Sequence, residues 1–464
     1  MSVAAAPGAA APFAARLVGH WRALFLLAWP VVLSRAGILV MIIVDVVMVA
    51  RYDIEALGAL SIALAVFAPL LISGIGCMLG IVAIVARQHG RGEAGAAVGT
   101  LFRGLRWAIV IGAVVTLLIS FGELALAAFG HRPELVETGG AVARWLAPGA
   151  FLQILFVALS FYLEGTERML PGLIAMIAAN IVNAVLNLAL IGGSYAVLEL
   201  GAEGAAIATT AARAVMLATL LLYVFTRPEV RRRLHRLGWR FGGLWGPGGW
   251  RAGAEMRRIG LAGGAAMAFE TFAFATLNHV AGLIGPMALA AYTIAHNVEA
   301  TIFMVALGIS VAAAVRVGGF AGRGDMSEAR FAGWSALAAT MLLIALLGAV
   351  VVAFSGPVAS VYSTDPDLVA RSSALFILLA ISLIFDGGQV VMSQCNRAFG
   401  DSWQTTIRFF IAFWLVMVPV GSVLGMATPL GEAGLFIGTA LGCVLAALLF
   451  ALRFASLAAG AKPG

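Results

Sequence analysis

Residues Phe25–Ala50 read FLLAWPVVLSRAGILVMIIVDVVMVA, an apolar run in which only Arg35 and Asp45 are charged. As a helix, a run of this length can cross the ~30 Å of hydrocarbon in a bilayer. It is too long for the apolar core of a signal peptide, and no clear cleavage site follows it. We therefore interpret it as a first, retained transmembrane helix, which makes the chain an integral membrane protein.

Apolar runs of this kind recur along nearly the whole chain. Of its 464 residues, 62% are hydrophobic and 11% are charged, and the mean hydropathy is +1.03. Soluble globular proteins carry about 25% charged residues, so a soluble fold is excluded. Runs of this length fit helices and not barrel strands. The predicted spans are residues 25–50, 57–86, 105–129, 141–163, 171–193, 203–225, 260–284, 287–316, 331–354, 371–394, 406–427 and 433–456.

The basic residues indicate topology and not nucleic-acid binding. Between the sixth and seventh predicted spans lies a linker, residues 226–258, with nine arginines and two glutamates. Positive charges concentrate on the cytoplasmic side of membrane proteins. We expect this linker and both termini to be cytoplasmic, in a bacterial inner membrane, and we expect a monomer. The spacing of the three cysteines gives no disulfide framework and no metal motif.

The two halves of the chain resemble each other at a nearly constant offset. The matching segments are residues 56–63 with 288–295 and 90–93 with 322–325, both at an offset of 232, and 200–209 with 430–439 at an offset of 230. Six spans return the chain to its starting side, so the repeat is expected to be parallel. We predict an all-α protein of about twelve transmembrane helices in two six-helix lobes, residues 1–225 and 259–464, joined by the linker.

A few charged residues fall deep inside the predicted spans. They are Asp45, Glu270, Glu299, Asp386, Arg35 and Arg213. Such a charge costs at least ~2.5 to 3.5 kcal/mol at the bilayer centre, so each needs a partner or a wet cavity. The acidic residues are therefore candidates for transport chemistry. The alternative is that they form structural ion pairs with Arg35 or Arg213.

The fifth span carries a row of amides. Asn180, Asn183 and Asn187 are spaced by three and four residues and share one helix face. They could hold helices together, or they could offer neutral oxygen ligands to a cation bound by Asp45, with Thr209 adding a hydroxyl.

Catalytic motifs are not apparent. His296 and Glu299 form an H-x-x-E spacing, but no third ligand follows nearby, so we predict no metal site apart from a sodium ion. No phosphate-binding loop or Gly-x-Ser-x-Gly motif occurs, so neither ATP hydrolysis nor hydrolase chemistry is indicated. An intramembrane enzyme with His279 or His296 as a base beside Asp386 stays a remote alternative. We predict no enzyme and no cofactor, and energy from an ion gradient.

Several motifs resemble those of the multidrug and toxic compound extrusion transporters, in particular the NorM-type branch. The resemblance runs from Leu24 to Phe454. It is carried by Pro30 and Val44-Asp45 in the first span, residues 90–93, Asn183 to Asn187, residues 204–209, Phe269-Glu270, and Asp386 with Gln389.

What the resemblance implies is a cation-coupled antiporter that exports small organic, often cationic, compounds by alternating access. It implies a Na⁺ or H⁺ site at Glu270 and Asp386 in the C-terminal lobe. A second site would comprise Asp45, Asn183, Asn187 and Thr209 in the N-terminal lobe. Some relatives carry an aspartate where this chain has Asn187, so proton coupling in that lobe would depend on Asp45. Further candidate cavity residues are Asn180, Asn278, Asn297, Glu299, Gln389 and Arg213.

One alternative within the same architecture is a flippase for lipid-linked saccharides. Such a protein would want a cationic cavity, and the acidic residues within these spans argue against it. The partners expected for the antiporter are small organic substrates and the lipid bilayer, with no nucleic acid.

Overall fold

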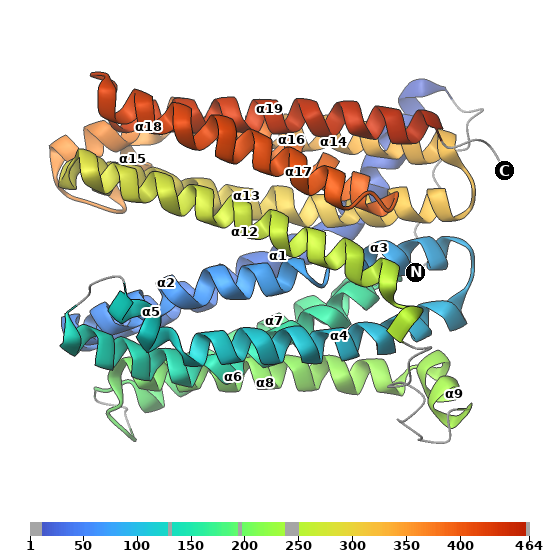
Figure 1. Cartoon of the computed structure of the whole chain (residues 1–464), viewed down its shortest axis with the longest axis horizontal. Coiled ribbons are helices and arrows are strands. Elements are labelled where there is room, and N and C mark those ends of the chain that lie inside the picture. Colours follow the sequence, from blue (N-terminus) through green and yellow to red (C-terminus); the bar gives the residue numbers. More distant parts are fainter. Residues whose placement is uncertain (1–11, 129–131, 194–196, 237–249, 461–464) are drawn as a thin grey trace. The chain divides into compact units, whose positions relative to one another are not determined.

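The computed structural model describes residues 12–128, 132–193, 197–236 and 250–460 (Figure 1). All regular elements in these ranges are helical, which confirms the predicted fold class. Twelve of them, with α2–α3 and α17–α18 each counted once, are long and apolar enough to cross a membrane. Residues 237–249 of the predicted linker lie outside the described residues.

The helices follow one another along the chain with short connections. They are α1 (Phe13–Tyr52), α2 (Ile54–Gly76), α3 (Leu79–Gly90), α4 (Ala94–Ser120), α5 (Gly122–Ala128), α6 (Pro133–Gly165), α7 (Leu170–Leu190), α8 (Gly201–Thr226), α9 (Pro228–Arg236), α12 (Ala254–Ile284), α13 (Pro286–Gly322), α14 (Met326–Ala353), α15 (Ser355–Ser360), α16 (Pro366–Ala398), α17 (Trp403–Ala412), a π-helical turn (Phe413–Met417), α18 (Val418–Ala427) and α19 (Glu432–Gly460).

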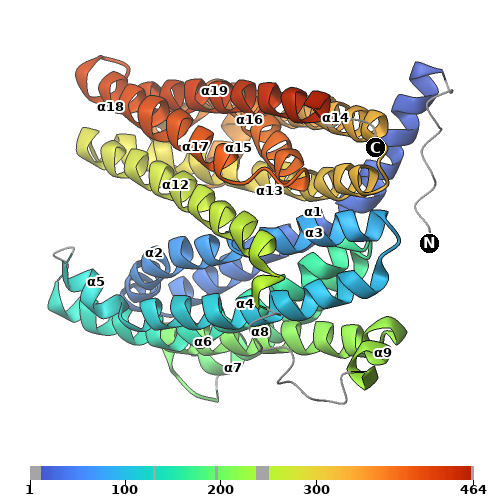
Figure 2. The ribbon, with the colours of Figure 1, turned by 45° about the vertical axis from the view of Figure 1, so that its right-hand side comes forward.

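The chain forms two compact units. The N-terminal unit comprises residues 33–268, and the C-terminal unit comprises residues 1–32 together with 269–464. In the N-terminal unit α6 packs against α2, α4 and α8, and in the C-terminal unit α16 packs against α13, α14 and α19 (Figure 2). Since α6 and α16 are the fourth spans of their halves, equivalent helices occupy the centre of each unit.

The internal duplication extends to individual backbone hydrogen bonds. After α3, the amide of Arg91 donates to Arg87 O and that of Gly92 to His89 O; after α13, Arg323 donates to Gly319 O and Gly324 to Ala321 O. Gly92 has φ 73° and Gly324 has φ 81°, a left-handed conformation that glycine adopts at little cost. The offset of 232 found in the sequence therefore relates turns of the same conformation.

The first part of α1, up to Val32, belongs to the C-terminal unit. Arg16 pairs with Glu328 at 2.9 Å, and His20 Nε2 lies 2.8 Å from the same carboxylate. Arg316 donates to His20 Nδ1 at 3.0 Å. Because arginine can only donate, His20 must carry its proton on Nε2 and donate it to Glu328. The predicted span began only at Phe25, since polar residues such as His20 and Arg22 were assigned to the region before the helix.

The first part of α12, up to Ala268, belongs to the N-terminal unit. It packs backbone to backbone against the break between α2 and α3. A Cβ on Gly76 would lie 2.8 Å from Gly263 O, so the approach requires glycine. At this break the carbonyl of Cys77 accepts a hydrogen bond from Trp107 Nε1 at 3.0 Å.

Candidate functional site

Three neutral donors converge on the carboxylate of Asp45 in the N-terminal unit. Asp45 lies on α1, Asn183 and Asn187 on α7, and Thr209 on α8. Oδ1 of Asp45 accepts from Nδ2 of Asn183 at 2.9 Å and from Nδ2 of Asn187 at 2.7 Å. Its Oδ2 accepts from the Thr209 hydroxyl at 2.5 Å. All four side chains are buried, so the four residues predicted for this half form one dry polar cluster.

The amide row of α7 divides into two kinds of contact. Asn180 Nδ2 donates to the backbone carbonyls of Gly37 and Met176, at 3.1 and 3.0 Å, and so fastens α7 to α1. Asn187 Oδ1, in contrast, is buried without a hydrogen-bond partner in the described part of the chain. A buried acceptor of this kind is costly unless a donor or cation reaches it.

Arg213 lies on α8, one turn beyond Thr209. Its guanidinium lies 4.8 Å from the ring centroid of Phe67 and is close enough to Asp45 to interact with it electrostatically. Gly149 on α6 leaves room for it, since a Cβ there would lie 3.1 Å from Nη1. Among the described residues, Nη1 of Arg213 has no hydrogen-bond partner.

The other intramembrane cation, Arg35, pairs with a residue that sequence reasoning missed. Arg35 Nη2 lies 3.5 Å from Glu164 Oε1, and Ser160 donates to the same oxygen at 2.9 Å. Glu164 is 4% exposed. It was missed because the predicted fourth span ended at residue 163, which placed Glu164 in a connection. The pattern of an acid at the end of one span and an unexplained cation in another could have suggested the pair.

In the C-terminal unit one amide connects two carboxylates. Gln389 Nε2 donates to Asp386 Oδ1 at 2.9 Å and to Glu270 Oε1 at 3.4 Å, which joins α16 to α12. Cys443 on α19 donates to Asp386 Oδ1 with an Sγ–O distance of 3.7 Å. Asp386 is 3% exposed and Glu270 is half-buried. Gln389 Oε1 is buried and lacks a hydrogen-bond partner within the described chain.

Glu299 extends this cluster from α13. It accepts from the Ser382 hydroxyl at 3.4 Å and lies 3.1 Å from His296 Nδ1, and it interacts electrostatically with Asp386. The cluster therefore contains three carboxylates, of Glu270, Asp386 and Glu299. Repulsion among buried carboxylates favours binding of a cation or a proton.

Arg397 supplies the positive charge in this region. It interacts electrostatically with Glu270 and donates to Ser393 Oγ and Gln394 Oε1, at 3.4 and 3.3 Å. Sequence reasoning placed Arg397 in a connection, but it lies in the last turn of α16 and is 4% exposed. Arg397 is therefore a buried positive charge that acts on Glu270 without a direct ion pair.

The remaining candidates lie apart from these contacts. Asn278 is half-buried, and Asn297 and His279 are exposed. Within the described residues, none of the three is hydrogen-bonded to Glu270 or Asp386. No group of at least three His, Cys, Asp and Glu side chains in the described ranges could hold a metal ion.

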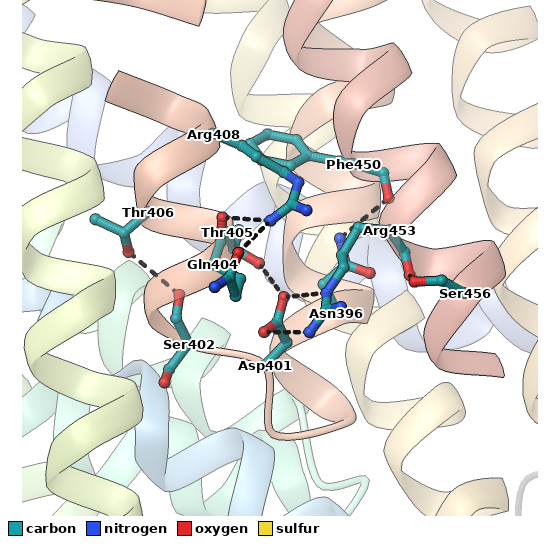
Figure 3. Close-up of polar contacts among 10 residues, drawn as sticks. All are labelled: Asn396, Asp401, Ser402, Gln404, Thr405, Thr406, Arg408, Phe450, Arg453 and Ser456. Carbon is teal, nitrogen blue, oxygen red and sulfur yellow. Dashed lines mark hydrogen bonds and ion pairs between the residues drawn. The ribbon is translucent and has the colours of Figure 1, made fainter. Parts of the chain in front are cut away.

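Each unit carries a further ion pair after its fourth span. In the N-terminal unit Arg168 binds Glu229 at 2.6 Å. Partial burial alone would raise the pKa of Glu229, but the hydrogen bond and charge of Arg168 outweigh it and leave the pKa below its ordinary value. In the C-terminal unit Arg453 donates two hydrogen bonds of 3.1 Å to Asp401, which also accepts from Thr405 (Figure 3).

Comparison with known proteins identifies the family and the fold of the chain. A family model described as MatE matches residues 30–189 and 264–423, so it matches each half once. The chain is 35% identical to a probable multidrug resistance protein NorM of Caulobacter vibrioides over 92% of this chain and 90% of that protein. It is 32% identical to a probable NorM protein of Bradyrhizobium diazoefficiens, over 93% and 92%. Among solved structures it resembles the eukaryotic MATE transporter AtDTX14, with a TM-score of 0.85 and 19% identity over 96% and 99%.

Proposed function

Because the chain belongs to the MatE family of multidrug transporters, we propose that it exports small organic compounds, many of them cationic, in exchange for Na⁺ or H⁺. The protein is a multi-pass membrane transporter of the NorM type and not an enzyme. The coupling ion, the charge of the substrate and the direction of exchange are the proposed elements. As an antiporter it would need no cofactor.

The observation that carries the proposal is the shared amide of Gln389. It joins the buried Asp386 to the half-buried Glu270, and two carboxylates held this close cannot both stay ionised at low cost without a compensating positive charge. Carboxylate oxygens and the buried, unpartnered Gln389 Oε1 are the ligand types that a hard cation accepts. A proton on either carboxylate would serve the same purpose.

Exchange follows from competition for this negative charge. A cationic substrate and the coupling ion are both attracted to Asp386 and Glu270, so occupancy by one weakens binding of the other. If the substrate binds from the cytoplasm and the coupling ion binds from the outside, the ion gradient drives export of the substrate without ATP. We propose that the protein reaches the two sides by alternating access, as expected for duplicated transporter folds.

The second proposed site is the Asp45 cluster. Asn183, Asn187 and Thr209 present neutral polar groups around the carboxylate, and Asn187 Oδ1 lacks a partner in the described structure. We propose that Asp45 takes up a cation or a proton during the cycle. Because Asn187 is neutral, Asp45 is the one member of these four residues that can carry a charge or take up a proton.

The flippase alternative has less support. A carrier of anionic, lipid-linked sugars would require a surplus of buried cations at its site. The C-terminal cluster instead sets three carboxylates against the single guanidinium of Arg397 among its described contacts. This charge balance favours cationic substrates.

Purified protein in proteoliposomes tests the proposal directly. Efflux of a fluorescent organic cation should respond to an imposed Na⁺ gradient or an imposed pH gradient, each applied without the other. Asp386→Asn should abolish the response while its thermal stability in detergent stays near that of the wild type. Efflux that ignores both gradients in the wild type would refute cation coupling.

The proposed topology places both termini and the arginine-rich linker in the cytoplasm of a bacterial inner membrane, with the protein acting as a monomer. A reporter fused at Gly248 should be accessible from the cytoplasm only. Light scattering in detergent should give the mass of one chain.

A further inference from the structure

The repeat aligns two chemically different residues next to the two key aspartates. Residues 200–209 match 430–439 at an offset of 230, and Gly201 and Gly431 share a left-handed φ, 54° and 52°. Arg213 of α8 follows Thr209 by one turn, and Cys443 of α19 follows Thr439 by one turn. The same offset therefore aligns Arg213 with Cys443 in the repeat (443 − 213 = 230). Cys443 donates to Asp386, and Arg213 lies one turn beyond Thr209, whose hydroxyl donates to Asp45.

In the N-terminal unit this position carries a fixed positive charge. Asp45 already accepts three hydrogen bonds from neutral donors, and Arg213 lies near it without a direct hydrogen bond. Arg213 is 7% exposed, and its Nη1 finds no hydrogen-bond partner among the described residues. Its charge is therefore compensated mainly by Asp45, at a distance, and by the face of the Phe67 ring.

In the C-terminal unit the same position carries a neutral thiol. Cys443 donates a weak hydrogen bond to Asp386 and brings no charge. The nearest charged neighbours of Asp386 are Glu270 and Glu299, both of its own sign. A cation that enters this cluster is attracted by three carboxylates. Arg397, the positive charge in the cluster, acts on Glu270.

We propose that the residue at this repeated position sets the cation affinity of each half. Arg213 acts as a tethered counter-ion that weakens binding of the coupling cation at Asp45, and Cys443 leaves Asp386 free to bind it. The inference rests on the proposed function, because it concerns the same coupling ion. Arg213 is thus a specificity-determining residue for the N-terminal site.

The physical reason is direct repulsion. A cation bound at Asp45 would lie in the same low-dielectric region as the guanidinium of Arg213. Among the described residues, Asp45 is the one carboxylate that acts on this guanidinium, so no other carboxylate would offset the repulsion. Between buried like charges several ångströms apart, such repulsion changes affinity by about tenfold or more. Removing the guanidinium should therefore strengthen cation binding at Asp45, and adding one beside Asp386 should weaken it there.

The test exchanges the two residues. In proteoliposomes, efflux of ethidium would be measured against a series of Na⁺ concentrations and, separately, of imposed pH gradients. Arg213→Cys should lower the half-saturating cation concentration about tenfold or add a second saturable phase. Cys443→Arg should raise that concentration at least about tenfold or remove the cation dependence. Binding of radioactive Na⁺ to the purified variants should change in the same directions.

Matched variants separate this role from a structural one. Arg213→Lys keeps the charge and should lie nearer to the wild type than Arg213→Cys. Arg144→Cys removes an exposed arginine of the same unit, paired with Glu123, and should leave cation dependence unchanged. If Arg213→Cys only lowers abundance or thermal stability and leaves the half-saturating concentration as in the wild type, the inference is wrong. A wild type indifferent to both gradients would instead overturn the proposed function beneath it.

Discussion

The two units place opposite charges on matching helices, with the signs exchanged, but only Arg35 and Glu164 form a direct ion pair. In the N-terminal unit the cation, Arg35, lies on α1 and the anion, Glu164, ends α6; in the C-terminal unit the anion, Glu270, lies on α12 and the cation, Arg397, ends α16. The ends of α6 and α16 are equivalent in detail. The amide of Glu167 donates to Glu164 O at 2.9 Å, and that of Gly400 donates to Arg397 O at 2.8 Å.

The pairs that follow these helices are also exchanged. Arg168 binds Glu229 in the N-terminal unit, whereas Asp401 binds Arg453 in the C-terminal unit. The duplicated scaffold therefore needs opposite charges at these positions but accepts either arrangement. In the C-terminal unit this arrangement puts the carboxylate of Glu270 in the same hydrogen-bonded cluster as Asp386. In the N-terminal unit the corresponding carboxylate, Glu164, is paired with Arg35 and is not part of the Asp45 cluster.

The largest expected effect concerns the carboxylates themselves. If the C-terminal cluster dominates coupling, Asp386→Asn should reduce gradient-driven efflux at least about tenfold, a step of ~1.4 kcal/mol. Asp45→Asn should reduce it less, because Arg213 already offsets that charge. Initial efflux rates of the two variants, normalised to the amount of reconstituted protein, decide the order. A larger loss in Asp45→Asn would reverse the comparison.

Next in size is the cost of breaking a buried pair. Arg35→Ala leaves the carboxylate of Glu164 buried without its cation, and breaking such a pair typically costs about 3 to 5 kcal/mol. Arg397→Ala should cost less, because Arg397 acts on the half-buried Glu270 electrostatically without a direct ion pair. Thermal unfolding in detergent would rank the variants. Equal losses of unfolding temperature in the two variants would contradict this order.

Exchanging the charges within a pair sharpens the comparison further. Arg35→Glu combined with Glu164→Arg gives the N-terminal unit the polarity of the C-terminal unit. We expect the double variant to recover about 0.5 to 3 kcal/mol relative to the sum of the single changes, the range for residues in contact. A double-mutant cycle on unfolding temperature measures this coupling, and strict additivity would contradict it.

The smallest effect is expected at the partly exposed pair of Arg168 and Glu229. Glu229→Gln should change stability by no more than about 1 kcal/mol, because such pairs are screened by water. The folded-state pKa of Glu229 is lowered, so its contribution is complete above the unfolded pKa and is lost only as the pH falls through the folded one. The difference in unfolding temperature from the wild type should therefore stay constant from about pH 5 to about pH 8.

Much of the architecture could be predicted from hydropathy and repetition, because both are local or periodic signals. Asp45 is hydrogen-bonded to Asn183, Asn187 and Thr209, and Gln389 connects Glu270 with Asp386, while the role of these residues in ion binding stays a prediction. The helix ends were less accurate. Ala94 begins a helix predicted to start at residue 105, because Arg103 was assigned to a connection.

The partners of the charged side chains could not be predicted in the same way. Arg35 and Glu164 are 129 residues apart, and nothing in the sequence gives the distance between two helices that are not adjacent in the chain. Cys443 is a second example. The same offset that aligned Thr209 with Thr439 aligns it with Arg213, but Asp386 and Asp45 lie on different helices of the repeat, so its place beside Asp386 could not have been predicted.

The division of α1 between units has a consequence for biogenesis. His20 is synthesised well before its partner Glu328, which follows 308 residues later, and Arg16 depends on the same carboxylate. Contacts so distant in sequence form late. The polar first turns of α1 must therefore wait for most of the protein to be inserted, and a ribosome that stalls before α14 would leave them unpaired. Such incomplete chains should be recognisable to membrane quality control by this exposed end of the first helix.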